Sequence, residues 1–292
     1  GTPESVSNTD PHLSSQFKQD AGFDPFTADV NYAYASAETG AKYLDDTTDA
    51  PYAPYVDCQA PGVGCVPGVL TQIDLYFDQL KQKGYNPDTL GDANTVYLIW
   101  AGGNDFFNDI AKLLPATHRN QTQVLGAVRQ LSRFWQGETL RTGLSAQLSN
   151  PIANLRRAVG VLHQHGVSYD RIYVFNLPDM SKTPAAQAFA KGNKLILAAV
   201  KALSSIFDAA LQLDLMTASD KHGRVRVFDI GKVFNDIERH HDQYGLDNLT
   251  QSCFAEGQDF PQCAGFAFYN DKHPTRKVEE IVDAFFQKWE NA

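Results

Sequence analysis

The sequence lacks any unbroken run of about 18 apolar residues, the length that a helix needs to cross a bilayer, so we expect no transmembrane segment. It also lacks a cluster of basic residues: 25 lysines and arginines stand against 34 acidic residues, and the net charge is −9. A protein that binds nucleic acid must neutralise phosphates, so we expect no nucleic-acid partner. The same excess of acidic residues argues against docking on anionic lipid by charge alone. Transient contact with a membrane surface is still compatible with this composition.

Several catalytic motifs are also missing. No GxSxG occurs, which argues against an α/β-hydrolase elbow, and neither an HExxH helix nor a P-loop is present. His163 and His165 form one histidine pair, and His240 and His241 form another. Each pair could bind a metal, but solvated surface histidines are far more common. We therefore expect neither a metal nor any other cofactor.

The chain has few cysteines: four occur, in two local pairs, Cys58 with Cys65 and Cys253 with Cys263. Each pair brackets a short loop of glycine, proline and polar residues, without the CxxC spacing of a zinc ribbon. The alternative to two disulfides is four free thiols. Short disulfide loops fit the spacing better, and they predict an oxidising compartment, so we expect a secreted, extracellular or periplasmic protein.

Hydrophobic residues make up 43% of the chain, and their spacing alternates between helical and extended patterns. Helices are predicted over 69–83, 152–162, 185–212 and 275–289, and buried strands over 96–100, 172–175 and 225–229. This alternation predicts an α/β fold in which helices flank a mainly parallel sheet. We expect a single domain over residues 1–292. Residues 108–150 would form an insertion, either a lid or a plain surface excursion.

Two polar motifs follow or precede the predicted elements. Residues 100–107 read WAGGNDFF, so Asn104 comes directly after a strand. Ligands of parallel sheets bind beyond the carboxyl ends of the strands, where a side-chain amide can donate to a developing oxyanion. Residues 270–275 read NDKHPT, which places His273 before the last helix, where it could act as a general base. Taken singly, an ordinary glycine turn and a solvated histidine explain these motifs at least as well.

Taken together, the motifs resemble those of the GDSL (SGNH) hydrolases. GGND and HPT are similar to the third and fifth conserved blocks of that family. Residues 31–40, NYAYASAETG, resemble the second block of its secreted lipase-like branch, and residues 176–184, NLPDMSKTP, resemble a further segment of that branch. The resemblance covers nearly the whole chain. It implies a three-layer α/β sandwich with a flavodoxin-like strand order.

The resemblance implies two donors to an oxyanion. Asn104, which follows Gly103, would donate its side-chain amide. Ser36 stands where the second block has a glycine, and its backbone N–H would be the other donor. A serine still offers that N–H, although its Cβ narrows the backbone conformations that the position can adopt.

The resemblance also assigns the base, because His273 would take the proton of the nucleophilic serine. The family's acid lies three residues before this histidine, where the chain has Asn270, and Asp271 follows it. Three arrangements stay open. Asp271 takes over as the acid, or Asn270 orients the ring as a neutral partner, or a Ser–His dyad operates alone. An amide cannot stabilise imidazolium as a carboxylate does, so the second arrangement predicts a slower enzyme.

The block that should carry the nucleophile has no match, because GDS occurs nowhere in the chain. Residues 4–10, ESVSNTD, imitate it loosely, and Ser5 or Ser7 would be the serine on that alignment. The stretch that begins SVSNTD resembles a later family segment instead. We therefore expect the first strand and the nucleophilic serine to lie before Gly1. Because that strand is central in the family's sheet, its loss would expose strand edges and apolar surface.

The implied activity is hydrolysis of acyl esters through an acyl-enzyme. Lipids are the expected substrates, for a lysophospholipase, a phospholipase A or an acyltransferase to an alcohol. Phe134 and Trp135 in the insertion favour lipid slightly. The first alternative is a carbohydrate acetylesterase. The second is a binding protein that kept the fold without catalysis, which the missing serine, the altered glycine and the displaced acid would favour.

Overall fold

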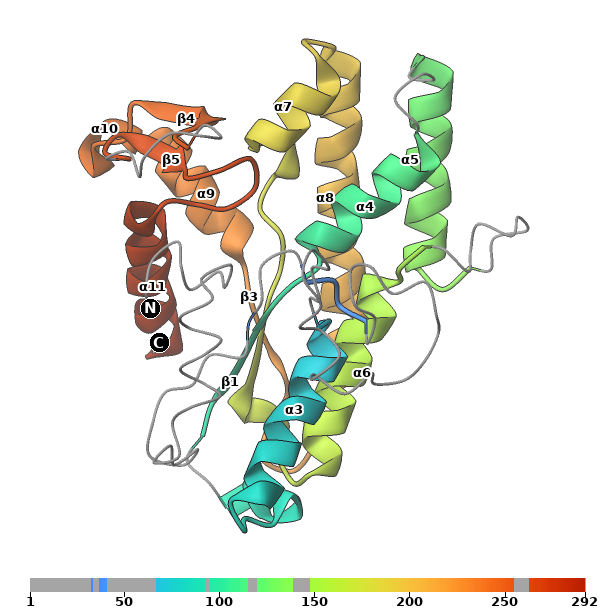
Figure 1. The fold of residues 1–292 in the computed structure, drawn as a ribbon, viewed down its shortest axis with the longest axis vertical. Coiled ribbons are helices and arrows are strands. Elements are labelled where there is room, and N and C mark those ends of the chain that lie inside the picture. The colour runs from blue at the N-terminus through green and yellow to red at the C-terminus, as the bar shows by residue number, and fades with distance from the viewer. Residues whose placement is uncertain are drawn as a thin grey trace, which may run out of the picture.

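The structure is a computed structural model in which helices and short strands alternate along the chain (Figure 1). It describes residue 33 and residues 37–40, 67–92, 95–114, 120–138, 148–254 and 263–291. The α-helices are α3 (Val69–Gln82), α4 (Gly103–Leu113), α5 (Gln121–Trp135), α6 (Pro151–Gln164), α7 (Pro184–Ala190), α8 (Lys194–Leu215), α9 (Ile230–Arg239), α10 (His241–Tyr244) and α11 (Arg276–Glu290). The 3-10 helices are η2 (Pro87–Asp92), η4 (Tyr169–Arg171) and η5 (Met180–Lys182). The strands are β1 (Tyr97–Trp100), β2 (Ile172–Phe175), β3 (Arg226–Phe228), β4 (Asn248–Ser252) and β5 (Phe266–Phe268).

β1, β2 and β3 form a parallel sheet in that order. The register pairs Tyr97 with Ile172 and Trp100 with Phe175, and it pairs Phe175 with Phe228 across the next two strands. Helices connect each of these strands to the next, as parallel pairing requires. β4 and β5 form a separate two-stranded parallel sheet. The predicted α/β class with parallel strands is therefore confirmed.

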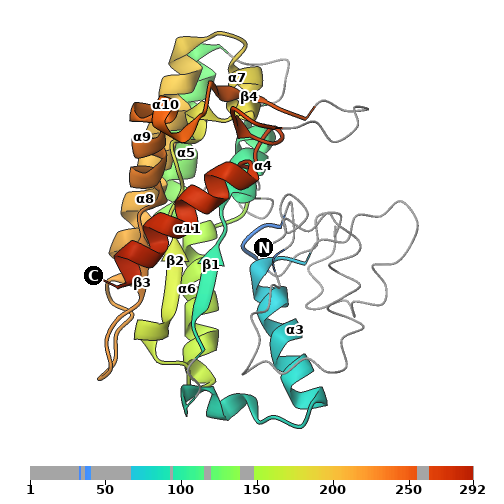
Figure 2. The same cartoon turned by 90° about the vertical axis from the view of Figure 1, so that its left-hand side faces the viewer.

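Successive residues of β2 point to opposite faces, so the strand separates two apolar clusters. Ile172 and Val174 belong to the larger cluster, which includes buried residues of α3, α4, α5, α6 and α8. Tyr173 and Phe175 belong to the smaller one, where the rings of Phe175 and Phe286 of α11 lie 5.3 Å apart. Figure 2 shows α11 in front of the strands and α6 and α8 behind them. Helices therefore cover both faces of β2.

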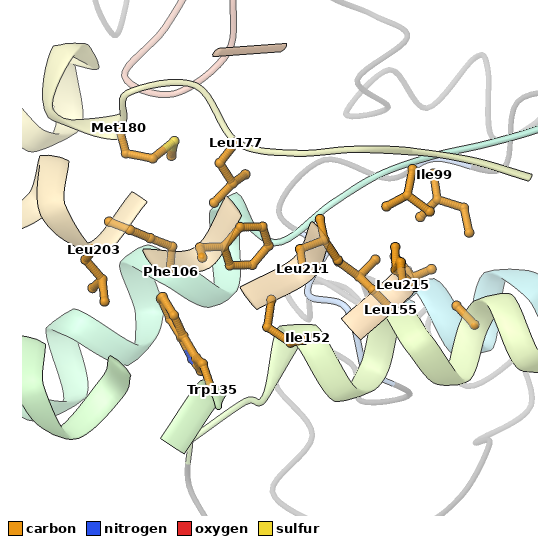
Figure 3. Packing of buried hydrophobic residues seen from close by; sticks show 14 of the residues in the cluster. Ile99, Phe106, Trp135, Ile152, Leu155, Leu177, Met180, Leu203, Leu211 and Leu215 are labelled. Carbon is orange, nitrogen blue, oxygen red and sulfur yellow. The ribbon is translucent and has the colours of Figure 1, made fainter. Parts of the chain in front are cut away.

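The insertion predicted over residues 108–150 contributes a helix to the core. α5 turns Leu131 and Trp135 inward, and both side chains are fully buried. The Trp135 ring lies 5.8 Å from the ring of Phe106 in α4 and 5.8 Å from the ring of Phe207 in α8. Figure 3 shows Phe106 and Trp135 next to each other in this cluster. A plain surface excursion is therefore the wrong interpretation of α5, because its inner face packs between α4 and α8.

One face of β1 is exposed. Ile99 is buried in the larger cluster, whereas Leu98 and Trp100, which point to the other face, are 56% and 43% exposed. Val96, just before the strand, is 43% exposed on the same side. Within the described ranges β1 pairs with β2 alone. An open strand edge beside exposed apolar side chains is a place where a further strand can pair.

The helical region predicted over 185–212 is divided into two helices. Lys191 and Gly192 both adopt left-handed conformations, with φ of 48° and 80°, and they end α7. The apolar spacing continues across this break, because Ala186 and Ala190 before it and Ile196 after it are all buried. The sequence pattern therefore does not reveal the turn.

α8 bears on the expectation that the chain has no transmembrane segment. With 22 residues, it is the one helix in the described part of the chain that is long and apolar enough by length and composition. Its most apolar stretch is 39% buried, and Leu203, Phe207 and Leu211 lie in the larger cluster. The core helix of a protein without a membrane span passes the same test, so α8 is weak evidence for one.

The last third of the chain adds α9, α10 and the β4–β5 pair, which the sequence pattern does not predict. The predicted disulfide between Cys253 and Cys263 is present, and it bridges the connection from β4 to β5. Cys58 and Cys65 lie outside the described residues. The disulfide agrees with an oxidising compartment. Secretion itself stays a prediction.

Candidate functional site

The carboxyl ends of the three parallel strands meet at one edge of the sheet, and polar residues follow each of them. Asn104 comes after β1, Asn176 after β2 and Asp229 after β3. The Nδ2 of Asn176 donates to Asp229 Oδ1 at 3.2 Å, and its Oδ1 accepts from the N–H of Ile230 at 2.7 Å. Both ends of this amide are used inside the protein, so Asn176 ties two strand ends together as a structural residue.

Gly102 makes the turn from β1 into α4. Its φ of 112° is left-handed, and a Cβ at this position would lie 2.8 Å from the Phe207 ring. A residue with a side chain would therefore be strained and would collide with the core. The turn places Gly103 and Asn104 in the first turn of α4, where backbone N–H groups have no partner within the helix.

Asn104 links the two motifs that the sequence offers for an oxyanion site. Its Nδ2 donates to the carbonyl oxygen of Ala37 at 3.0 Å, and the side chain is half-buried. An amide nitrogen carries two hydrogens, so this contact leaves one N–H for a ligand. Residues 37–40 are the described end of the second motif. Ser36, the other predicted donor, lies outside the described residues.

Residues 37–40 are held from two directions. At the start of α3, the N–H of Val69 donates to the carbonyl oxygen of Glu38 at 3.0 Å. From α4, Asn108 Nδ2 donates to Glu38 Oε1 at 2.8 Å. Thr39 is fully buried between these elements. The segment therefore has a fixed position beside the first turn of α4.

Asn270 holds His273 in the loop before α11. The Oδ1 of Asn270 accepts the backbone N–H of Lys272 at 3.0 Å and that of His273 at 2.8 Å, which closes a tight turn. The ring Nδ1 of His273 lies 3.0 Å from Oδ1 and 2.9 Å from Nδ2 of the same amide. With its hydrogen on Nδ1, the ring donates to Oδ1 and keeps Nε2 as the basic nitrogen.

Asp271 does not take the place beside the ring. Its side chain is exposed, and its carbonyl oxygen accepts from the N–H of Ala185 at 2.8 Å. Burial lowers the pKa of His273 below its usual value; the charge of Asp271 opposes this shift, and that of Lys272 adds to it. Of the three arrangements that the sequence leaves open, the contacts therefore favour Asn270 as a neutral partner of the ring.

The loop that carries His273 lies next to α4. Lys272 Nζ stands 5.7 Å from the centre of the Phe107 ring, which is one turn after Asn104. The N–H of Tyr269 donates to the carbonyl oxygen of His273 at 2.9 Å and so fixes the loop on β5. Asn104 and His273 therefore lie on neighbouring elements at the same end of the sheet.

Comparison with known proteins adds no family to this geometry. No family model matches the chain, and no curated protein does. The resemblance to GDSL hydrolases therefore rests on short motifs and on where the fold puts them.

The described residues contain no group of three His, Cys, Asp or Glu residues that could hold a metal. The two histidine pairs of the sequence have other contacts. The His163 ring stacks on Tyr169 with centroids 3.9 Å apart. His240 Nδ1 lies 3.1 Å from Asp236 Oδ1, on the preceding turn of α9. Packing and local hydrogen bonds thus account for one member of each pair.

Sequence reasoning missed a buried polar cluster behind Asn104. Asp105 and Asp109, one turn apart on α4, are both fully buried. Asp105 accepts from the hydroxyl of Thr39 at 2.7 Å, and Asp109 accepts from the N–H of Ser149 at 3.1 Å. Two carboxylates four residues apart on a helix are the sequence signal that could have revealed it.

Three buried carboxyl groups lead us to expect that the protein is more stable at mildly acid pH than at alkaline pH. Burial raises the pKa of Asp105 to about 6, of Asp109 to about 7 and of Asp208 to about 7, from a usual value of 3.8. The folded state therefore binds these protons more tightly than the unfolded state. This stabilisation is complete below pH 3.8 and is lost as pH rises through about 6 and 7. We expect the free energy of unfolding, measured by urea titration, to be several kcal/mol higher at pH 5 than at pH 8.

A matched variant identifies the source of this difference. The lowered pKa of His273 has the opposite effect on the free energy of unfolding, because the folded state resists protonation of the ring. The three carboxyls outweigh this single histidine. Asp208→Asn keeps an oxygen that can accept the N–H of Leu177, which Asp208 accepts at 2.9 Å. This variant should narrow the gap between the two pH values. Equal free energies of unfolding of the wild-type protein at pH 5 and at pH 8 would contradict the prediction.

Proposed function

We propose that the chain is a serine ester hydrolase of the GDSL (SGNH) type, built as a three-layer α/β sandwich, which cleaves acyl esters through an acyl-enzyme. The observation that carries the proposal is the meeting of two sequence motifs at one end of the parallel sheet. Asn104 offers an amide N–H there, and His273 is oriented there by Asn270. An oriented histidine near an amide donor supplies what acyl transfer needs besides a nucleophile.

The proposed reaction gives each of these residues one task. A serine attacks the ester carbonyl, and His273 Nε2 takes the serine proton while Nδ1–H donates to Asn270 Oδ1. The second N–H of Asn104 stabilises the oxyanion of the tetrahedral intermediate. The intermediate collapses to the acyl-enzyme, and His273 gives its proton to the departing alkoxide. Water then repeats the sequence on the acyl group and releases the acid.

We place the nucleophilic serine on a strand that pairs with the open edge of β1. The exposed apolar face of β1 supports this, because a neighbouring strand and its cover would bury that face. A parallel strand there would end beside Asn104, since the carboxyl ends of parallel strands share one edge. Ser5 and Ser7 are the candidates for this serine that the sequence offers, and both lie outside the described residues.

Lipid acyl esters are the substrate class that we propose, on the strength of the resemblance to the lipase-like branch. The aromatic residues of the insertion add no support, because Trp135 is buried and Phe134 packs against the core. Hydrolysis rates for p-nitrophenyl esters from acetate to laurate separate the alternatives. A rate that rises with chain length supports lipid esters, and a maximum at acetate favours a carbohydrate acetylesterase.

A fluorophosphonate probe tests the proposal, because it phosphonylates an activated serine. Peptide mass spectrometry should find one serine adduct, and His273→Ala should abolish the labelling. An adduct on Ser5 or Ser7 would assign the nucleophile to the first residues of this chain. An adduct on a serine before Gly1, in a longer form of the protein, would place it there. No adduct and no ester turnover in either form would reject hydrolysis in favour of a non-catalytic binding protein.

Asn270→Asp is expected to raise kcat by about tenfold or more, because a carboxylate stabilises the imidazolium and an amide does not. The aspartate can accept the same N–H groups from Lys272 and His273, so the turn should persist. The new charge should also raise the pKa of His273, which the pH profile of kcat/KM measures. Asn270→Ala, as control, should lower kcat. A lower kcat in the aspartate variant would show that the reaction requires the neutral amide.

A further inference from the structure

The residue after Asn104 anchors a polar network whose centre, Asp105 with Thr39, is fully buried. Asp105 accepts the backbone N–H of Thr39 at 3.0 Å, the hydroxyl of Thr39 at 2.7 Å and the hydroxyl of Ser149. Asn154 of α6 donates its Nδ2 to both hydroxyls, at 3.0 Å to Thr39 Oγ1 and at 3.3 Å to Ser149 Oγ. The network thus joins four parts of the chain: residues 37–40, α4, the end of the insertion and α6.

The hydrogen bonds of this network run in one direction. The amide of Asn154 donates to the two hydroxyls, and each hydroxyl passes its single hydrogen to Asp105. Asp105 must then accept every bond that it makes. An ionised carboxylate does so, whereas a protonated one carries an O–H that needs an acceptor of its own. A proton on Oδ1 of Asp105 would compete with the hydroxyls of Thr39 and Ser149, and a proton on Oδ2 would oppose the backbone N–H of Thr39.

Stability does not explain why a charge is kept here. Burial raises the pKa of Asp105 to about 6, so ionising this carboxyl costs more free energy in the folded state than in the unfolded chain, although the ionised form still predominates at neutral pH. Well-packed neutral side chains are often at least as stable in such places. The charge instead fixes the position of residues 37–40 relative to α4. Adjacent residues of α4 hold adjacent parts of one segment: Asn104 binds the carbonyl of Ala37, and Asp105 binds the N–H of Thr39.

We propose that Asp105 is a positioning residue of the acyl-transfer site, whose ionised carboxylate fixes residues 37–40 against α4 and thereby aligns the oxyanion donors. This inference rests on the proposed function. Asn104 gives one amide hydrogen to the carbonyl oxygen of Ala37, so the direction of its other N–H depends on where Ala37 is held. Asp105 itself contacts no reacting atom in this scheme and acts through Thr39.

The main test compares Asp105→Asn with the wild-type protein at pH 8, with a p-nitrophenyl ester as substrate. We expect kcat to fall about 10- to 100-fold and KM to stay within about threefold, because misaligned donors weaken binding of the transition state alone. We expect Tm at pH 8 to change by no more than about 5 °C, because a neutral amide costs less to bury than a carboxylate but its NH2 group meets donors where the carboxylate accepted hydrogen bonds. A Tm that falls by more than about 10 °C together with kcat would assign Asp105 a folding role and overturn the inference.

A pair of Thr39 variants isolates the hydroxyl that connects Asn154 to Asp105. Thr39→Ser keeps this hydroxyl, and Thr39→Val keeps the shape of the side chain without it. We expect the serine variant to retain kcat within about threefold and the valine variant to lose about tenfold. Amide hydrogen exchange of the peptide that contains residues 37–40 should be faster in Thr39→Val and in Asp105→Asn than in the wild type.

The outcomes separate this inference from the proposed function. Unchanged kcat in Asp105→Asn, or equal losses in the two Thr39 variants, would overturn the positioning role while wild-type turnover still supports an ester hydrolase. A wild-type protein that neither hydrolyses esters nor reacts with a fluorophosphonate would overturn both. The behaviour of the wild-type protein therefore shows which of the two has failed.

Discussion

The His273→Ala protein is expected to hydrolyse acyl esters at least about 10⁴-fold more slowly than the wild type, as measured by kcat. In the proposed reaction Nε2 takes the serine proton, because Nδ1 is engaged by Asn270 at 3.0 Å. Alanine removes the base, the acid that protonates the leaving alkoxide, and the positive charge that faces the oxyanion. Steady-state hydrolysis of a p-nitrophenyl ester measures the loss.

His222→Ala is the matched control for this experiment. His222 is exposed in a turn before β3, and its contact with Asp220 Oδ1, at 2.8 Å, is made by its backbone N–H. Loss of this imidazole should leave kcat unchanged. Equal melting temperatures for the two variants exclude unfolding as the cause of the loss. Wild-type turnover by His273→Ala would show that another group is the base and would reject the mechanism.

Asn104→Ala is expected to lower kcat by about 10²- to 10³-fold with little change in KM, which is the loss typical of removing one oxyanion donor. The donor is preformed, because the Gly102 turn puts Asn104 in the first turn of α4 and the carbonyl of Ala37 orients its amide. Asn104→Asp has nearly the same shape and should lose at least as much, since a carboxylate repels the oxyanion. kcat and KM are measured on the same ester series.

Asn108→Ala provides the comparison on the same helix. Asn108 lies one turn after Asn104, and its amide contacts the side chain of Glu38 rather than the backbone of that segment. Its removal loosens residues 37–40 without removing an oxyanion donor, so kcat should fall less than in Asn104→Ala. Equal losses in the Asn104 and Asn108 variants would mean that contact with residues 37–40, and not donation to an oxyanion, is what the reaction requires.

The secondary structure was largely predictable because burial imposes a period on the sequence. The apolar spacing over 69–83 predicted α3, and the run at 172–175 coincides with β2, whose four residues are all buried. The break between α7 and α8 was hidden because helical spacing continues through the left-handed pair Lys191 and Gly192. β4 was hidden because its residues are mostly polar and none is buried, and β5 was hidden because three residues are too few to show an alternation.

The site was predictable only where its chemistry is local. The motifs around Asn104 and His273 are short and follow predicted elements, so sequence reasoning found both. Whether Asn270 or Asp271 is the partner of the His273 ring depends on which of the two side chains closes the turn. The two residues are adjacent, so the sequence alone does not decide between them. The spacing of Asp105 and Asp109 was visible in the sequence, but the partners of Asp105 were not predictable, because they lie 66 and 44 residues away along the chain.

The Cys253–Cys263 disulfide determines what a break in the backbone would do to this region. Cleavage between the two cysteines would give a two-chain protein whose fragments stay joined, one band on a gel without reductant and two with it. The N–H of Cys253 would still donate to the carbonyl of Phe268, and that of Tyr269 to the carbonyl of His273. The stretch between the cysteines is therefore a place where the chain can be opened, lengthened or exchanged for a tag while the histidine keeps its anchorage.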